Sequence, residues 1–134
     1  RIAYNAIPSV VYTNPEIACI GLTEKDLNDI REGDFAPSMS TDKPFVPYEV
    51  HKLPMTFSGR FVAENEGETG LCKVIVDSRN KTIIGVHMIG NPCSEFVAAA
   101  SFAVRMGYTV GEFKQVVFPH PTVGEVLREV IMES

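Results

Sequence analysis

The feature of this chain that most limits its fold is a hairpin signal near the middle. Two apolar runs with alternating side chains, 71–76 and 82–89, flank the short polar segment 77–81. Polar residues between two such runs are typical of a tight turn, and so short a connection joins antiparallel strands. The centre of the chain therefore predicts an antiparallel sheet.

The order of the other segments extends this prediction. β-branched and aromatic side chains mark further strands before the hairpin, whereas most segments with helical periodicity follow it. This order favours an α+β fold, an antiparallel sheet with helices packed on one face, over a βαβ repeat. We expect strands at 7–13, 17–22, 48–56, 71–76 and 82–89, and helices at 23–32, 94–106, 109–115 and 123–132.

Two segments are less regular. Residues 34–47 are rich in Pro, Ser, Asp and Thr, and prolines within a segment forbid a long helix there, so we expect a loop. Residues 61–70 match neither the strand pattern nor the helix pattern and stay unassigned.

The chain is long enough for one core but too short for a complete two-nucleotide enzyme. A chain of 134 residues buries about two-thirds of its unfolded surface, so we expect a single domain over 1–134. One dinucleotide-binding domain takes roughly 100 to 200 residues, and no Gly-x-Gly-x-x-Gly segment occurs. We therefore expect a fragment of a longer enzyme, and a first residue, Arg1, that is not Met fits this expectation.

Charge and hydropathy bear on the possible partners. The formal net charge is −5, without a basic run, which argues against nucleic acid and anionic membranes. No apolar stretch approaches the roughly 20 residues of a membrane helix.

The histidines and cysteines are scattered along the sequence, so we expect no metal site. We expect buried or unreactive thiols at Cys19, Cys72 and Cys93.

The segment 120–125 (HPTVGE) is the strongest candidate for chemistry. His120 stands just before a predicted helix, and Glu125 lies one turn inside it. An imidazole titrates near neutral pH, and a carboxylate can fix its tautomer and stabilise its cation. Pro121 and the helix start would hold the two side chains stiffly. The spacing therefore fits a general base with an orienting acid.

A structural explanation of the same spacing stays open. Thr122 and Glu125 match the capping box, in which a hydroxyl and a carboxylate accept hydrogen bonds from the first N–H groups of a helix. Thr109 and Glu112 repeat this tetrapeptide at the preceding helix, where no histidine stands two residues upstream. Spacing alone therefore does not distinguish a catalytic Glu125 from a helix cap.

Other reactive side chains are weaker candidates. His51 and His87 lie within predicted strands, where a lone histidine more often packs than reacts. Cys93 precedes a helix, whose N-terminus can lower the pKa of a thiol, but no base is near it in sequence.

Three segments together resemble a known family. The segments 7–24 (IPSVVYTNPEIACIGLTE), 85–90 (GVHMIG) and 120–125 (HPTVGE) are similar to the C-terminal interface domain of the flavin-dependent pyridine nucleotide-disulfide oxidoreductases, and most of all to the dihydrolipoamide dehydrogenases among them. The resemblance covers nearly the whole chain in the right order.

The resemblance implies a role in an obligate homodimer. His120 would enter the active site of the partner subunit as the acid-base residue toward the dithiol substrate, and Glu125 would orient it. The backbone at His120 and Pro121 would approach the flavin of the partner subunit. The family often has a cis peptide bond between these two residues, and by the same resemblance we expect one between Asn14 and Pro15.

By the same resemblance, the full-length enzyme would use FAD and NAD, held by domains upstream of this chain, and this fragment alone would bind neither. The expected reaction is dihydrolipoamide plus NAD⁺ to lipoamide plus NADH, with dihydrolipoamide or a lipoyl-bearing protein as substrate, in the cytoplasm or a mitochondrial matrix. A mercuric or glutathione-type reductase and an inactive structural dimerisation module stay as alternatives. Gly124 departs from the family, which commonly has a side chain there, and the loop 34–47 is longer than in most relatives.

Overall fold

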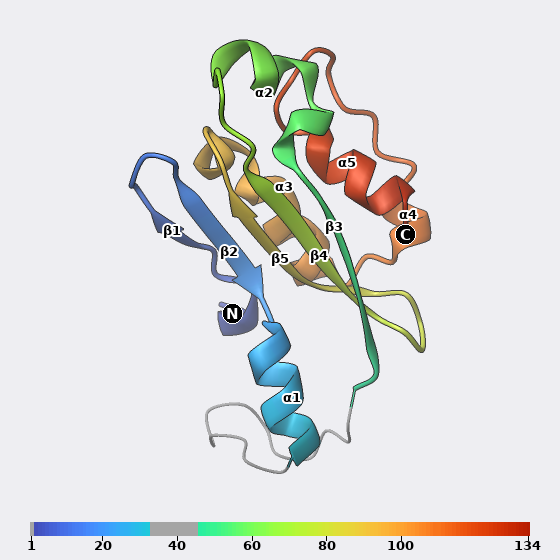
Figure 1. Ribbon diagram of the computed structural model, residues 1–134. Helices are drawn as coiled ribbons and strands as arrows, with labels where there is room; N and C mark the ends of the chain where they lie inside the picture. Colours follow the sequence, from blue (N-terminus) through green and yellow to red (C-terminus); the bar gives the residue numbers. More distant parts are fainter. Residues whose placement is uncertain (1, 33–45) are drawn as a thin grey trace.

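The computed structural model describes residues 2–32 and 46–134, which form an antiparallel sheet with helices (Figure 1). The strand order is β1-β2-β5-β4-β3, and every neighbouring pair is antiparallel. The predicted fold class is therefore confirmed. The strands are β1 (Ser9–Val11), β2 (Ile17–Gly21), β3 (Tyr48–Leu53), β4 (Leu71–Asp77) and β5 (Ile83–Ile89).

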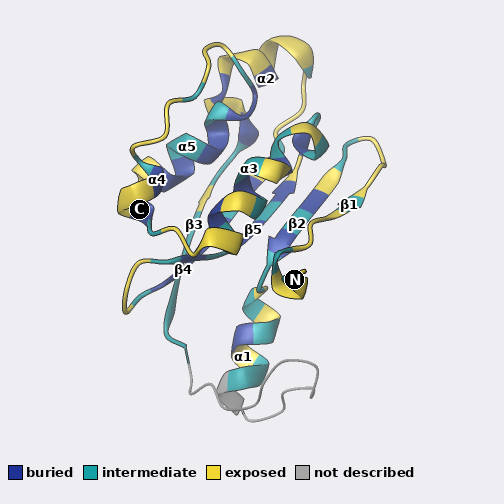
Figure 2. Ribbon diagram, turned by 180° about the vertical axis from the view of Figure 1, so that it is seen from behind, coloured by how far each residue is buried: buried dark blue, intermediate teal, exposed yellow. Residues whose placement is uncertain are grey.

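Two helices cover one face of the sheet. Helix α3 (Cys93–Met106) packs on β2 and β5, and α5 (Glu125–Met132) packs on β3 and β4. The side chains between these helices and the sheet form the buried core, and Figure 2 colours the ribbon dark blue at the buried residues. The other helical elements are η1 (Tyr4–Ala6), α1 (Glu24–Glu32), η2 (Met55–Phe57), α2 (Gly59–Glu64) and α4 (Val110–Phe113).

The central hairpin forms as predicted. The Lys81 N–H donates to the Asp77 carbonyl at 2.8 Å, and the Asp77 N–H donates to the Thr82 carbonyl at 2.9 Å. The Asp77 carboxylate also accepts hydrogen bonds from the backbone and guanidinium of Arg79. Local polar contacts thus close the turn between β4 and β5.

Some predicted boundaries are wrong. The strand expected at 48–56 ends at Leu53, because Pro54 has no N–H to continue the ladder and a turn of 3-10 helix follows. The unassigned segment 61–70 starts inside α2, which spans Gly59–Glu64 and places the ring of Phe61 in the core with 0% exposed. The last helix begins at Glu125, two residues after the predicted start.

Other local predictions are confirmed. Gly107 closes α3 with a left-handed φ of 65°. The expected cis peptide bonds, Asn14-Pro15 and His120-Pro121, are both present, and Asn91-Pro92 is a third that was not predicted. The loop expected at 34–47 lies outside the described residues except for its last two. In the described part of the chain, no helix is long and apolar enough to cross a membrane.

Candidate functional site

The site is built on the loop that enters α5. His120 lies on this loop with 80% of its side chain exposed, and Glu125, the first residue of α5, has 22% of its side chain exposed. The Nδ1 atom of His120 lies 2.9 Å from Oε1 and 3.1 Å from Oε2 of Glu125. The two predicted residues are therefore in direct contact.

The carboxylate of Glu125 is held from two sides. Besides the imidazole, it accepts a hydrogen bond from the Thr122 N–H at 2.8 Å. This backbone hydrogen bond, and after it the contact with His120, lower the pKa of Glu125 below its ordinary value. The group is therefore ionised at neutral pH and can only accept hydrogen bonds.

The charge of Glu125 defines the role of each imidazole nitrogen. An ionised carboxylate has no proton to give, so Nδ1 of His120 must donate the hydrogen bond. In the neutral ring, Nε2 then carries a lone pair. Within the described residues, no hydrogen bond involves Nε2 of His120. The ring therefore presents a basic nitrogen to the outside.

The two identical tetrapeptides form different hydrogen bonds. Thr109 and Glu112 make the full capping box at α4, with the Glu112 N–H donating to Thr109 Oγ1 at 3.2 Å. At α5 the N-cap position is Gly124, without a side-chain cap, and Thr122 Oγ1 instead donates to the Pro119 carbonyl at 2.9 Å. The capping box that was left open as an explanation of the spacing is therefore incomplete at α5. Only the carboxylate side of the box forms there, and that carboxylate also contacts His120.

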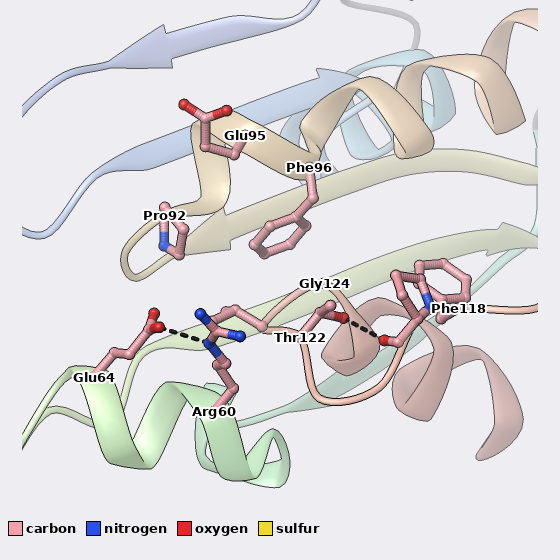
Figure 3. Close-up of a pocket in the computed structure, with 10 residues that line it drawn as sticks. Arg60, Glu64, Pro92, Glu95, Phe96, Phe118, Thr122 and Gly124 are labelled. Atoms are coloured by element: carbon pink, nitrogen blue, oxygen red, sulfur yellow. Dashed lines mark hydrogen bonds and ion pairs between the residues drawn. The ribbon is translucent and has the colours of Figure 1, made fainter.

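A pocket of about 410 Å³ adjoins this loop (Figure 3). Figure 3 shows Phe96 of α3 and the loop residues Phe118 and Thr122 around it, with the ion pair of Arg60 and Glu64 on α2 at its rim. A Cβ atom added to Gly124 would meet the Cβ of Phe96 at 3.4 Å, an ordinary contact. The lining residues are Arg60, Glu64, Pro92, Glu95, Phe96, Phe118, Pro119, Thr122, Val123 and Gly124.

Sequence reasoning missed the residues that hold the loop from α2. Ser58 Oγ donates to the Thr122 carbonyl at 2.9 Å, and Arg60 Nη1 donates to the Pro121 carbonyl at 3.3 Å. Ser58 directly precedes Gly59, and a serine at this position can be recognised as a helix cap. No sequence signal, however, links it to a loop 64 residues away.

The other candidates lie away from this site. The Nε2 atom of His87 lies 2.8 Å from the Leu22 carbonyl, and Nε2 of His51 lies 3.2 Å from Glu49 Oε2. Cys93 is buried, and burial raises the pKa of its thiol to about 11, so the helix N-terminus does not activate it. Burial also raises the pKa of Cys72, to about 12, and the pKa of Cys19.

Comparison with known proteins assigns the chain to a family. The profile of the pyridine nucleotide-disulphide oxidoreductase dimerisation domain matches residues 7–131. The chain belongs to this family. The dimerisation domain is 36% identical over 129 residues to the mitochondrial dihydrolipoyl dehydrogenase of Caenorhabditis elegans, an alignment that covers 96% of this chain and 23% of the relative. It is 36% identical over 123 residues to the dihydrolipoyl dehydrogenase of Thermus scotoductus, covering 92% of this chain and 23% of the relative.

Solved structures agree on the fold of the dimerisation domain. LpdA from Mycobacterium tuberculosis superposes with a TM-score of 0.78 at 22% identity, over 98% of this chain and 26% of that one. The HOCl-induced flavoprotein disulfide reductase RclA from Escherichia coli, as its Cu(II) complex, gives a TM-score of 0.76 at 19% identity, over 96% of this chain and 26% of that one. The chain thus spans about a quarter of the length of these relatives.

Proposed function

We propose that this chain is the single dimerisation domain of a longer, homodimeric dihydrolipoyl dehydrogenase. The full-length enzyme would convert dihydrolipoamide and NAD⁺ to lipoamide and NADH, with FAD and NAD bound by its other domains and dihydrolipoamide or a lipoyl-bearing protein as its substrate. The names of relatives that are 31 to 36% identical support this choice over a mercuric or glutathione-type reductase. These relatives include mitochondrial and bacterial enzymes, so we propose the matrix or the cytoplasm as the compartment.

The contact between His120 and Glu125 is the observation that carries the proposal. It leaves one imidazole nitrogen exposed and basic while an ionised carboxylate holds the other. A general base must lie within hydrogen-bond reach of the proton that it takes, and the exposed Nε2 is open to a group from outside the chain. We propose that this group is a dihydrolipoamide thiol bound in the active site of the partner subunit, and that the exposed backbone at His120 and Pro121 contacts the flavin there.

The proton transfer follows from the imidazole geometry. Nε2 of His120 would take the proton of a dihydrolipoamide thiol, and the resulting thiolate is the better nucleophile toward the redox disulfide that another domain of the full-length enzyme would supply. The imidazolium then donates from both nitrogens, and the negative charge of Glu125 stabilises it. The flavin and nicotinamide cofactors supply the electron-transfer chemistry. The residues of this chain handle protons, and the proton on His120 finally leaves to water.

The test uses the full-length enzyme. His120→Gln keeps a polar side chain of similar length but removes the base. Turnover should therefore fall by roughly 10² or more, the scale of general acid-base catalysis. Steady-state kinetics with dihydrolipoamide and NAD⁺ measure this, and flavin absorbance checks that the cofactor is still bound. Turnover close to that of the unaltered enzyme would remove His120 from the mechanism and with it the proposed function of this site.

A further inference from the structure

The start of α2 contacts the loop of His120 at two points. Ser58 donates from Oγ to the Thr122 carbonyl at 2.9 Å. Arg60 donates from Nη1 to the Pro121 carbonyl at 3.3 Å, and Figure 3 shows Arg60 beside this loop. Ser58 is only 3% exposed, whereas Arg60 has half of its side chain in solvent. The Ser58 contact is therefore the one shielded from competing water.

The hydroxyl of Ser58 is fixed in direction. It accepts a hydrogen bond from the Phe61 N–H at 3.2 Å as the N-cap of α2. A hydroxyl has a single proton to donate, and here that proton goes to the Thr122 carbonyl. One buried side chain therefore caps a helix and binds the loop at the same time.

Helix α2 is itself anchored, so that it can hold the loop in place. The ring of Phe61 lies in the core with 0% exposed. At the other end of the helix, Asn65 Nδ2 donates to the carbonyls of Phe61 and Asn91, each at 3.2 Å. The second of these hydrogen bonds ties α2 to the turn that precedes α3. The position of Ser58 is thus set by contacts independent of the loop.

A continuous series of contacts leads from Ser58 to the imidazole. The carbonyl of Thr122 accepts from Ser58, and the N–H of the same residue donates to Glu125 Oε2 at 2.8 Å. The same carboxylate lies 2.9 Å from Nδ1 of His120. Fixing the backbone at Thr122 therefore fixes the direction of the carboxylate that orients the imidazole.

We infer that Ser58 is a positioning residue for the pair of His120 and Glu125. Without its hydroxyl, the backbone at Thr122 loses its buried anchor, and the carboxylate of Glu125 samples directions away from Nδ1. The inference rests on the proposed function, because it assigns Ser58 a role in the same proton transfer.

The first experiment separates positioning from substrate binding. In the full-length enzyme, Ser58→Ala should lower kcat about tenfold, in line with the loss of one shielded hydrogen bond, and leave the KM for dihydrolipoamide unchanged. Ser58→Thr retains the hydroxyl and should restore most of kcat. Thr109→Ala removes the matching cap of α4 and should lower the melting temperature without changing kcat. A Ser58→Ala enzyme with unchanged kcat would overturn the inference.

The second experiment tests whether Ser58 acts through Glu125. In a Glu125→Gln background the orienting carboxylate is absent, so Ser58→Ala should lower kcat less than twofold. Equal fold losses in both backgrounds would show that Ser58 supports the fold and does not position the pair. If His120→Gln leaves turnover intact, the proposed function fails. If His120→Gln abolishes turnover but Ser58→Ala lowers kcat by the same factor with and without Glu125→Gln, only the role of Ser58 fails.

Discussion

Glu125 shows how one carboxylate can serve a backbone and a side chain together. It accepts from the Thr122 N–H and from Nδ1 of His120. Glu112, in the identical tetrapeptide, accepts within the described part of the chain only from Thr109, through the backbone N–H and the hydroxyl. The chemical difference between the two glutamates is thus the presence of an imidazole beside one of them.

This difference gives a matched pair of variants in the full-length enzyme. Glu125→Gln removes the charge that stabilises the imidazolium, so turnover should fall at least about tenfold, a part of what acid-base catalysis contributes. Glu112→Gln removes the same charge at α4 and should leave turnover unchanged. Steady-state kinetics on both variants check this. Equal behaviour of the two would mean that Glu125 serves only as a helix cap.

At the scale of elements, local signals were predictable and distant contacts were not. The hairpin between β4 and β5 could be predicted because its turn is closed by residues at most five apart. Helix α2 could not, since six residues are too few to show a helical period and its stability comes from the buried Phe61. The spacing of His120 and Glu125 was visible in the sequence. Their anchor at Ser58 could not be predicted, because it depends on how α2 packs against a loop 64 residues away.

Helix α5 gives a prediction at the same scale. Leu127 is 0% exposed between α5 and the sheet, whereas Met132 on the same helix is 43% exposed. Leu127→Ala would leave a cavity and should cost about 2–5 kcal/mol of unfolding free energy. Met132→Ala should change it by less than about 0.5 kcal/mol. Urea denaturation of both variants measures this, and a Leu127→Ala loss no larger than that of Met132→Ala would contradict the packing.

The whole molecule carries several carboxylates whose pKa is lowered by folding. Hydrogen bonds from Arg79 lower the pKa of Asp77, and a hydrogen bond from Lys73 lowers that of Glu24. A group with a lowered folded pKa stabilises the fold above its unfolded pKa and loses that contribution as the pH falls through the folded pKa. Within the described residues, Glu49, Glu112 and Glu125 also have a lowered pKa.

Stability should therefore be constant near neutral pH and fall below about pH 4, where unfolded carboxyl groups take up protons. Urea midpoints measured between pH 7 and pH 2.5 check the direction. Asp77 is the least exposed of these groups, so Asp77→Asn should make the decline shallower. A midpoint that rises on acidification would contradict the sign.

The outer face of α3 bears on the proposed homodimer. Phe102 and Met106, one turn apart, are 68% and 60% exposed, and Tyr4 of η1, which packs on α3, is 82% exposed. Figure 2 shows exposed residues along the outer side of α3 in yellow. Large apolar side chains gathered on one element are typical of an interface between subunits. This face, in a domain of the dimerisation family, is where we expect the second copy to bind.

The chain should therefore dimerise at micromolar concentration, as measured by sedimentation or light scattering. Phe102→Lys places a charge in the expected apolar contact and should shift the molecule to monomers, because burying an unpaired charge costs several kcal/mol. Glu66→Gln makes the same change in net charge on an exposed turn after α2 and should leave the dimer intact. A Phe102→Lys variant that stays dimeric would move the interface to another face, and a monomeric unaltered chain would mean that dimerisation requires the rest of the enzyme.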